Sequence, residues 1–258
     1  YDVPYLAHAA LEPLCCAARF DRDKLLVCGP LQAPEAARQV AAVKSGLPLD
    51  KVRVEVTFIG GGFGRKWAND FVETAVEVAM AAPGHLVKTI WTREQDFAAD
   101  QFRPAYSARF EVGLAADGSI AAMHGRVAGQ SINAYHKRPS PPGIGDPTAA
   151  AWLIYSAYDF PNKLINYHPV DLHIPVGFWR SVTMSQNSFF AESMIDEVAR
   201  ETGRDPLALR IALLARQPRM QAVLARAGAM IGWDKRRKRG VGRGIAMAYG
   251  DNSSCAQA

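Results

Sequence analysis

The sequence predicts an α+β fold made of mixed helical and sheet layers, and two observations carry this prediction. Residues 51–58 alternate apolar and polar side chains as a strand does, and apolar positions in residues 70–80 recur with a helical period. Such patterns alternate through residues 25–91, and an antiparallel hairpin at 106–127 and later consecutive helices from residue 186 follow. The elements therefore form an α+β mixture rather than a series of repeating βα units.

The other elements follow from the same periodicities and from residues that start or stop them. Pro34 fits a first helical position, and Gly46 stops the helix that it begins. Asp70 and Glu73 form a capping-box pattern at the start of the helix 70–80. The further expected elements are a strand at 25–28, a helix at 34–44, a strand at 86–91, a hairpin of 106–114 and 120–127, an extended segment at 161–174, helices at 186–201, 206–216 and 218–227, and a strand at 244–249.

Composition narrows the class of protein. A hydrophobic content of 49% can fill a large core, and the net charge of +5 suits a phosphate-bearing ligand but is too small to indicate nucleic acid. The four cysteines form no C-x-x-C pair, so the sequence specifies neither a zinc site nor an iron–sulfur cluster. No run approaches the ~20 apolar residues of a membrane-spanning helix. The first residue is Tyr1 rather than methionine, so we expect the chain to be a piece of a longer protein.

The most informative stretch is Ile59-Gly60-Gly61-Gly62-Phe63-Gly64-Arg65-Lys66, which joins the strand 51–58 to the helix 70–80. It is not a Walker A loop, because Lys66 is followed by Trp67, and its evenly spaced glycines do not fit the dinucleotide fingerprint. Glycines let the backbone approach a bound group closely, and the ring of Phe63 suits a wall against a flat cofactor. A glycine-rich turn without a ligand stays open as the alternative.

Five other segments allow a functional or a structural interpretation. His8 and Glu12 stand four residues apart, but Pro13 argues against a helix through them, so a polar anchor is favoured over a metal pair. Arg180 precedes a helix start and suits an anion or oxo-group cradle, with a structural salt bridge as the alternative. The irregular segment 134–149 is an access loop or a surface excursion. A solvated loop is expected at the basic run 235–239, and buried apolar packing at Cys15-Cys16.

Four segments in order resemble the molybdopterin-binding subunit of the xanthine dehydrogenase and aldehyde oxidase family of molybdenum hydroxylases. They are His8-Ala9-Ala10-Leu11-Glu12-Pro13, Gly60-Gly61-Gly62-Phe63-Gly64-Arg65-Lys66, Ile90-Trp91-Thr92-Arg93-Glu94, and Pro175-Val176-Gly177-Phe178-Trp179-Arg180-Ser181 with its continuation through Gln186. Arg65-Lys66 favours the bacterial isoquinoline 1-oxidoreductase branch. The resemblance implies a first molybdopterin-binding domain of the aldehyde oxidase type at 1–240 and an incomplete second one at 241–258, truncated before its C-terminal half.

The resemblance also implies the residues of the site. In the family, a glutamine 31 residues before the loop phenylalanine reaches the metal's oxo group, and Gln32 has this spacing from Phe63. Ser185 replaces a family proline, and Val182 replaces an aromatic residue that contacts purines, so purine oxidation is doubtful. The implied cofactor-binding residues are Gln32, Gly61, Gly62, Phe63, Gly64, Arg65, Trp179, Arg180, Ser181 and Gln186. No metal-ligating side chain is implied on this chain.

The implied cofactor is molybdopterin with molybdenum, in its cytosine dinucleotide form. The family's base is a glutamate near the carboxyl end of the full subunit, so it is expected beyond Ala258, and this chain alone is expected to be inactive. Because the cysteines for clusters are lacking here, the resemblance implies a small [2Fe–2S] partner subunit, with a cytochrome c as a candidate electron acceptor. Twin-arginine export to the periplasm is common among such relatives, and a cytoplasmic location stays open.

Two functions follow as expectations. In the first, the chain is part of a molybdenum hydroxylase that oxidises an N-heteroaromatic or aldehyde with water as oxygen donor. In the second, it is a cofactor-free scaffold or docking fragment without activity of its own. A nucleotide-binding enzyme is a third interpretation, and it predicts an affinity for ATP or NAD that we do not expect.

Overall fold

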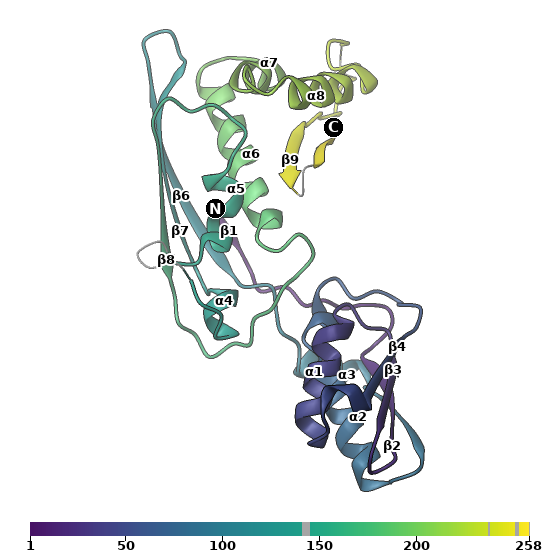
Figure 1. The fold of residues 1–258 in the computed structure, drawn as a ribbon. Coiled ribbons are helices and arrows are strands. Elements are labelled where there is room, and N and C mark those ends of the chain that lie inside the picture. The colour runs from purple at the N-terminus through teal and green to yellow at the C-terminus, as the bar shows by residue number, and fades with distance from the viewer. Residues whose placement is uncertain (141–144, 237, 251–252, 258) are drawn as a thin grey trace. The chain divides into compact units, whose positions relative to one another are not determined.

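The computed structural model describes residues 1–140, 145–236, 238–250 and 253–257. Its chain divides into two compact units (Figure 1). The glycine-loop unit comprises Tyr5–Pro104 and His173–Arg180, and the hairpin unit comprises Tyr1–Pro4, Ala105–Leu172 and Ser181–Ala258. Each unit is thus built from separate stretches of sequence.

The glycine-loop unit is a four-stranded mixed sheet with helices on one face. Its strands are β2 (Cys15–Phe20), β3 (Leu25–Gly29), β4 (Val52–Val56) and β5 (Leu86–Ile90), in the order β4-β3-β2-β5. The pair β3 and β4 is parallel because α1 (Pro34–Ser45) forms the crossover between them, and β2 runs antiparallel to both β3 and β5. Apolar residues of α1 and of α2 (Asp70–Ala81), among them Ala41, Phe71 and Val76, are buried in its core. The remaining elements are α3 (Arg93–Ala98) and two 3-10 turns, Leu49–Lys51 and Arg65–Trp67.

The ends of α1 and α2 test two predicted signals. Gly46 follows α1 in a left-handed conformation with φ +72°, which confirms the predicted stop. The capping box at Asp70 and Glu73 is wrong, because the residue that caps α2 is Asn69 and its side chain accepts no capping hydrogen bond. Asp70 lies one position inside the helix, and its carboxylate instead receives both terminal nitrogens of Arg65.

The hairpin unit contains a second four-stranded sheet in the order β1-β6-β7-β8. Its strands are β1 (Asp2–Val3), β6 (Tyr106–Leu114), β7 (Ile120–Gly129) and β8 (Lys163–Pro169). The expected hairpin is confirmed by the antiparallel register of β6 and β7, whereas β8 pairs with β7 in parallel. The helices are α4 (Ile132–Tyr135), α5 (Ala151–Ile154), α6 (Met184–Glu201), α7 (Pro206–Leu213) and α8 (Pro218–Met230), and a 3-10 turn at Pro147–Ala150 precedes α5. A two-stranded sheet of β9 (Ala246–Gly250) and β10 (Ser253–Gln257) follows α8.

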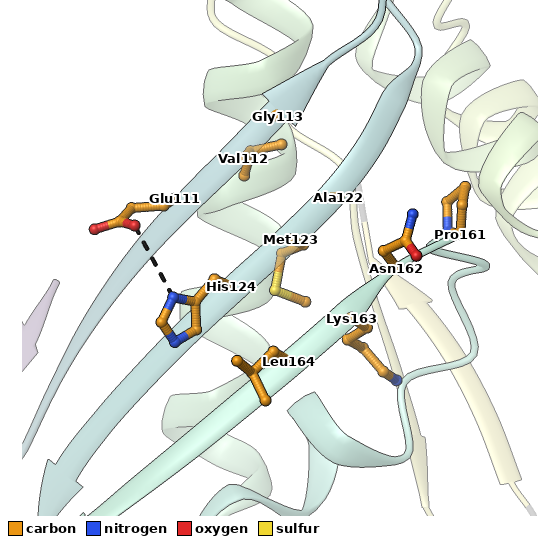
Figure 2. A pocket seen from close by; sticks show the side chains of 10 residues that line it. All are labelled: Glu111, Val112, Gly113, Ala122, Met123, His124, Pro161, Asn162, Lys163 and Leu164. Carbon is orange, nitrogen blue, oxygen red and sulfur yellow. Dashed lines mark ion pairs between the residues drawn. The ribbon is translucent and has the colours of Figure 1, made fainter.

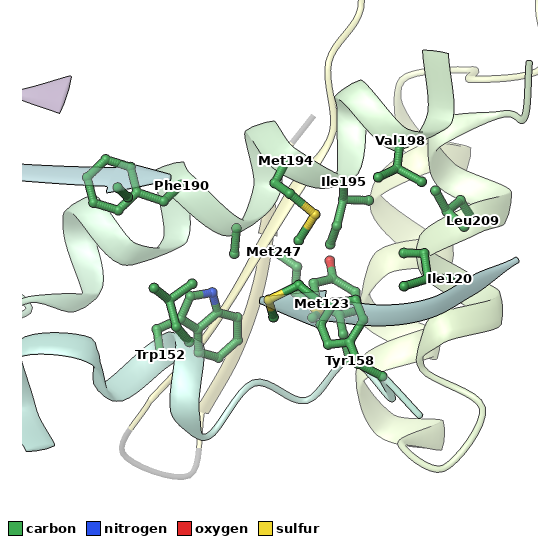
Figure 3. Close-up of a cluster of buried hydrophobic side chains, with 14 of the residues drawn as sticks. Ile120, Met123, Trp152, Tyr158, Phe190, Met194, Ile195, Val198, Leu209 and Met247 are labelled. Atoms are coloured by element: carbon green, nitrogen blue, oxygen red, sulfur yellow. The ribbon is translucent and has the colours of Figure 1, made fainter. Parts of the chain in front are cut away.

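A core of aromatic and aliphatic side chains holds this unit together. Figure 3 shows Trp152 of α5, Met123 of β7 and Met247 of β9 gathered beside α6. Beside this core, the fully buried guanidinium of Arg210 contacts the carboxylate of Glu192 at 2.7 Å, so the buried charge is paired. The unit is therefore a helical layer packed on one face of the β6–β7 hairpin.

Outside the helices and strands, the sequence predicts a solvated basic run, an irregular segment at 134–149 and a domain boundary near residue 240. The described part of the basic run (Lys235, Arg236, Lys238 and Arg239) is exposed, which confirms a solvated loop, and Arg237 lies outside the described residues. In the irregular segment 134–149, residues 141–144 also lie outside them. The domain boundary expected near residue 240 stays a prediction, although Ile245 and Met247 beyond it are buried in the core of the hairpin unit.

Candidate cofactor site

The glycine loop, residues 60–64, follows β4 and ends in the 3-10 turn Arg65–Trp67. Three of its residues have positive φ values: Gly61 at +98°, Phe63 at +52° and Gly64 at +104°. The value at Phe63 is uncommon for a residue with a side chain. Its ring is 40% exposed and would lie 3.1 Å from a side-chain carbon at Gly61. The loop therefore presents an aromatic ring on a stretch of bare backbone.

Gln32, which is separated from the loop by α1 and β4, contacts it directly. Its Oε1 accepts a hydrogen bond of 3.0 Å from the backbone N–H of Gly64. A side chain at Gly62 would overlap the same amide group. Because the N–H of Gly64 holds Oε1, the orientation of the Gln32 side-chain amide is fixed. Gln32 is exposed, so its Nε2 is a donor that a bound group can reach.

The segment His173–Arg180 returns to this unit and packs against the other end of the loop. It forms a bridge between Val176 and Phe102, and a side chain at Gly64 would overlap the carbonyl oxygen of Phe178. The same carbonyl lies 2.9 Å from Nε2 of His8. This contact requires glycine at position 64, because only glycine combines a φ of +104° with so close a neighbour.

His8 is held in turn by Asp100, a buried residue 92 positions away in sequence. The carboxylate receives the backbone N–H of His8 at 2.8 Å and lies 2.9 Å from its Nδ1. Burial alone would raise the pKa of Asp100, but the hydrogen bonds of His8 and the charge of Arg65 hold that pKa below its ordinary value. His8 is therefore a structural anchor, as predicted, but its partners are Asp100 and the carbonyl of Phe178 rather than Glu12.

Arg65 and Lys66 both point into the protein rather than outward from the loop. The guanidinium of Arg65 binds Asp70 at 2.8 and 2.7 Å and the carbonyl of Ala99 at 3.2 Å, and its Nε lies 3.2 Å from Asp100. Lys66 is fully buried and donates to Glu12. Of the predicted cofactor residues, Arg65 is thus buried and has its side chain engaged by Asp70, Ala99 and Asp100.

The remaining predicted residues are divided between the two units. Trp179 donates from Nε1 to the carbonyl of Ala7 at 3.4 Å, and Arg180 is exposed next to it in the glycine-loop unit. Ser181 and Gln186 belong to the hairpin unit. Gln186 is buried at the start of α6, and its Nε2 has no hydrogen-bond partner among the described residues. Ser181 and Val182 adopt φ values of +64° and +56°, which is a strained conformation for non-glycine residues.

Two hollows elsewhere do not involve these residues. One of about 600 Å³ lies on the sheet of the hairpin unit beside β6, β7 and β8, where Glu111 faces His124 at 3.9 Å (Figure 2). Burial holds the pKa of Lys163 at its rim below the ordinary value, and its Nζ donates to the carbonyl of Ile154. The other, about 550 Å³, lies between α6 and β9. Neither contains a predicted cofactor residue, so the candidate site is the glycine-loop surface.

The described residues contain no group of three or more histidine, cysteine, aspartate or glutamate side chains placed to hold a metal ion. Within the same residues, no helix is both long and apolar enough to cross a membrane.

Cys15, Cys16 and Cys28 are free thiols on β2 and β3, and of these three Cys16 alone is fully buried. Burial raises the pKa of Cys16 to about 12, so this thiol behaves as a small apolar side chain. The predicted buried packing is thus confirmed for Cys16, whereas Cys15 is only half-buried.

Residues 1–213 match the family model of the molybdopterin cofactor-binding domain, and the chain belongs to that family. Among curated proteins, it is 31% identical over 226 residues to the isoquinoline 1-oxidoreductase subunit beta of Brevundimonas diminuta, covering 84% of this chain. It is 26% identical to the xanthine dehydrogenase molybdenum-binding subunit of Escherichia coli O157:H7, also over 84% of this chain. The chain spans 28% of the length of each of these relatives.

Solved structures show the same fold. Quinoline 2-oxidoreductase from Pseudomonas putida 86 superposes with a TM-score of 0.77 at 17% identity, covering 91% of this chain and 32% of that one. Aldehyde oxidoreductase from Desulfovibrio gigas gives 0.69 at 21% identity, covering 89% and 27%. The expected family and the mixed α/β fold are thereby confirmed. The roles of the site residues stay predictions.

Proposed function

We propose that this chain is part of the large subunit of a molybdenum hydroxylase and that its glycine-loop surface contacts the molybdopterin cofactor. The supporting observation is the arrangement of Gln32, Phe63 and Gly64: an exposed ring on bare backbone beside an amide donor whose orientation is fixed. Such a surface fits a flat, polar cofactor, because the missing Cβ atoms allow close approach and the donor can meet an oxygen of the bound group.

When bound, the cofactor would supply the redox chemistry for oxidising an N-heteroaromatic or aldehyde substrate with oxygen from water. The residues of this chain would bind and orient it: Gln32 donates from Nε2, Phe63 and the glycines pack against it, and Arg180 offers a positive charge. The base glutamate, the cytosine dinucleotide form, a [2Fe–2S] partner subunit, a cytochrome c acceptor and a periplasmic location belong to the same proposal. Membership of the molybdopterin cofactor-binding family supports the cofactor, and a relative that is itself a subunit supports a partner subunit. The other features rest on the resemblance of the sequence alone.

Substitutions at Gln32 test this function in the full-length protein with its partner. Gln32→Glu keeps an oxygen that accepts from Gly64 N–H but removes the Nε2 donor, so we expect normal folding and a turnover lower by about 10²-fold at equal molybdenum content. Gln39→Ala, an exposed glutamine on α1 of the same unit, is the control and should leave turnover unchanged. Full turnover of Gln32→Glu would contradict a donor role.

A cofactor-free scaffold is the second candidate, and the inward orientation of Arg65 and Lys66 favours it, because neither charge faces the loop surface. Molybdenum analysis and pterin fluorescence of the purified 258-residue chain separate the two. Cofactor found in the chain alone would exclude the scaffold. Its absence here, with its presence in the full-length protein, would assign retention to residues outside this chain.

A further inference from the structure

One carboxylate, that of Glu12, joins the two ends of the glycine loop. Its Oε2 accepts from the backbone N–H of Gly60 at 2.9 Å, where the loop begins, and from the ammonium of Lys66, where the loop has ended. The backbone N–H of Glu12 also donates to the carbonyl of Gly60 at 3.1 Å. A side chain at Gly60 would come within 2.6 Å of Cβ of Glu12, so the two residues are in close contact.

Lys66 places a positive charge in the interior of the unit, and a buried charge needs a partner. Its side chain is fully buried, whereas that of Glu12 is one-third exposed, so the ammonium depends on Glu12 for the charge that offsets its burial. Burial of Glu12 opposes ionisation, but its hydrogen bonds with Lys66 and Gly60 hold its pKa below the ordinary value. The main chain of Lys66 continues the connection, because its carbonyl accepts from the backbone N–H of Gln32 at 3.4 Å.

We propose that Glu12 and Lys66 are positioning residues that hold the glycine loop, and Gln32 beside it, in the shape that receives the cofactor. The carboxylate of Glu12 contacts the loop backbone at Gly60 and is paired with the Lys66 ammonium, while the main-chain carbonyl of Lys66 contacts Gln32, so the pair acts on the site through Gly60 and Gln32. This inference rests on the proposed function for the cofactor, but the shape of the loop can be measured without it. The competing explanation is an ion pair that only stabilises the unit as a whole.

Hydrogen exchange measured on the full-length protein, stripped of cofactor, separates these explanations. Glu12→Gln keeps an acceptor for Gly60 N–H but leaves Lys66 without a counter-charge, and Lys66→Met removes the charge that Glu12 faces. In both variants we expect the amides of Gly60–Gly64 to exchange about 10²-fold faster, with those of α2 unchanged. The double variant Glu12→Gln/Lys66→Met buries no unpaired charge and should recover most of the protection. Lys44→Met, which breaks the surface pair of Lys44 with Glu77 in the same unit, is the control and should alter neither region.

Unchanged loop exchange, or an equal acceleration throughout the unit, would overturn the proposal. A second measurement, the molybdenum content of the cofactor-loaded protein, should fall in each single variant and recover in the double one. Full molybdenum content in a variant with a loosened loop would overturn the link between loop shape and cofactor. If the parent protein itself holds no molybdenum, the proposed function fails, while the exchange data still decide whether the pair positions the loop.

Discussion

Gly64→Ala is the substitution whose effect can be worked out most directly from the structure. The new methyl group would overlap the carbonyl oxygen of Phe178 and lie 2.6 Å from its carbonyl carbon, which is backbone rather than a flexible side chain. Relief of this overlap has to move the segment His173–Arg180 away from the loop. That movement would break the contact of His8 with the Phe178 carbonyl, and it would disturb the hydrogen bond from Gly177 to Phe102.

The expected cost has two parts. A φ of +104° is strained for alanine, at about 1–2 kcal/mol, and each buried polar group left without its partner costs about 1–3 kcal/mol. With one such group left unpaired, we therefore expect a loss of about 2–5 kcal/mol in the free energy of unfolding. For a unit of roughly 100 residues, each kcal/mol corresponds to about 4–8 °C in Tm, so the variant is expected to unfold well before the parent protein.

Gly46→Ala provides the matched control in the same unit. Gly46 also has a positive φ, +72°, but no atom lies within 4 Å of a methyl group placed there. Its substitution should cost only the conformational strain, about 1–2 kcal/mol. Urea unfolding of both variants, followed by hydrogen exchange at α1 and α2, measures the difference. If Gly64→Ala loses no more stability than Gly46→Ala, the packing of Phe178 on the loop does not limit stability and the reasoning is refuted.

Two further predictions concern the loop ring and a buried carboxylate. Phe63→Leu should change the free energy of unfolding by no more than about 1 kcal/mol, because the ring is partly exposed. It should nevertheless lower the molybdenum content of the full-length protein. If the molybdenum content falls only in proportion to Tm, the loop is a structural turn and not a cofactor contact. Hydrogen bonds from Thr148 and Ser131 outweigh burial and hold the pKa of Asp146 below its ordinary value, so its contribution to stability is present above about pH 4 and is lost as the pH falls through the lowered pKa. Asp146→Asn should therefore be less stable at pH 7 and show a smaller loss of Tm on acidification; an unchanged acid profile would contradict this.

The element types could be predicted wherever a single periodicity ran for several turns or strand positions. Helices α1, α2 and α6 lie within two residues of their expected starts, because their apolar faces and end residues are local signals. Strand β2 was missed because its sequence Cys-Cys-Ala-Ala-Arg-Phe has no β-branched residue. The capping box at Asp70 failed because Arg65 occupies the carboxylate, and this contact depends on the tertiary fold.

The candidate site was predictable only in part. The glycines and Phe63 could be identified from their own sequence, whereas the pairing of Gln32 with the loop was available only through resemblance, and the contact with Gly64 N–H now gives it a physical basis. The buried partners beneath the loop could not be found from spacing. Asp100 lies far from His8 in sequence, and the charges of Arg65 and Lys66 gave no sign of pointing inward. Long-range contacts of this kind are decided by packing rather than by local pattern.

The return of residues 173–180 to the glycine-loop unit has a consequence for synthesis on the ribosome. Gly64 leaves the exit tunnel long before Phe178, since the whole stretch Ala105–Leu172 is translated between them. Until the later segment emerges, the carbonyl that packs against Gly64 and binds His8 is missing. The loop can therefore reach its final conformation only after residues 173–180 have emerged, because this contact closes a long stretch of sequence. A nascent chain stalled before residue 173 should hold a folded sheet and helices but an unfinished loop, so cofactor loading would follow translation of this segment.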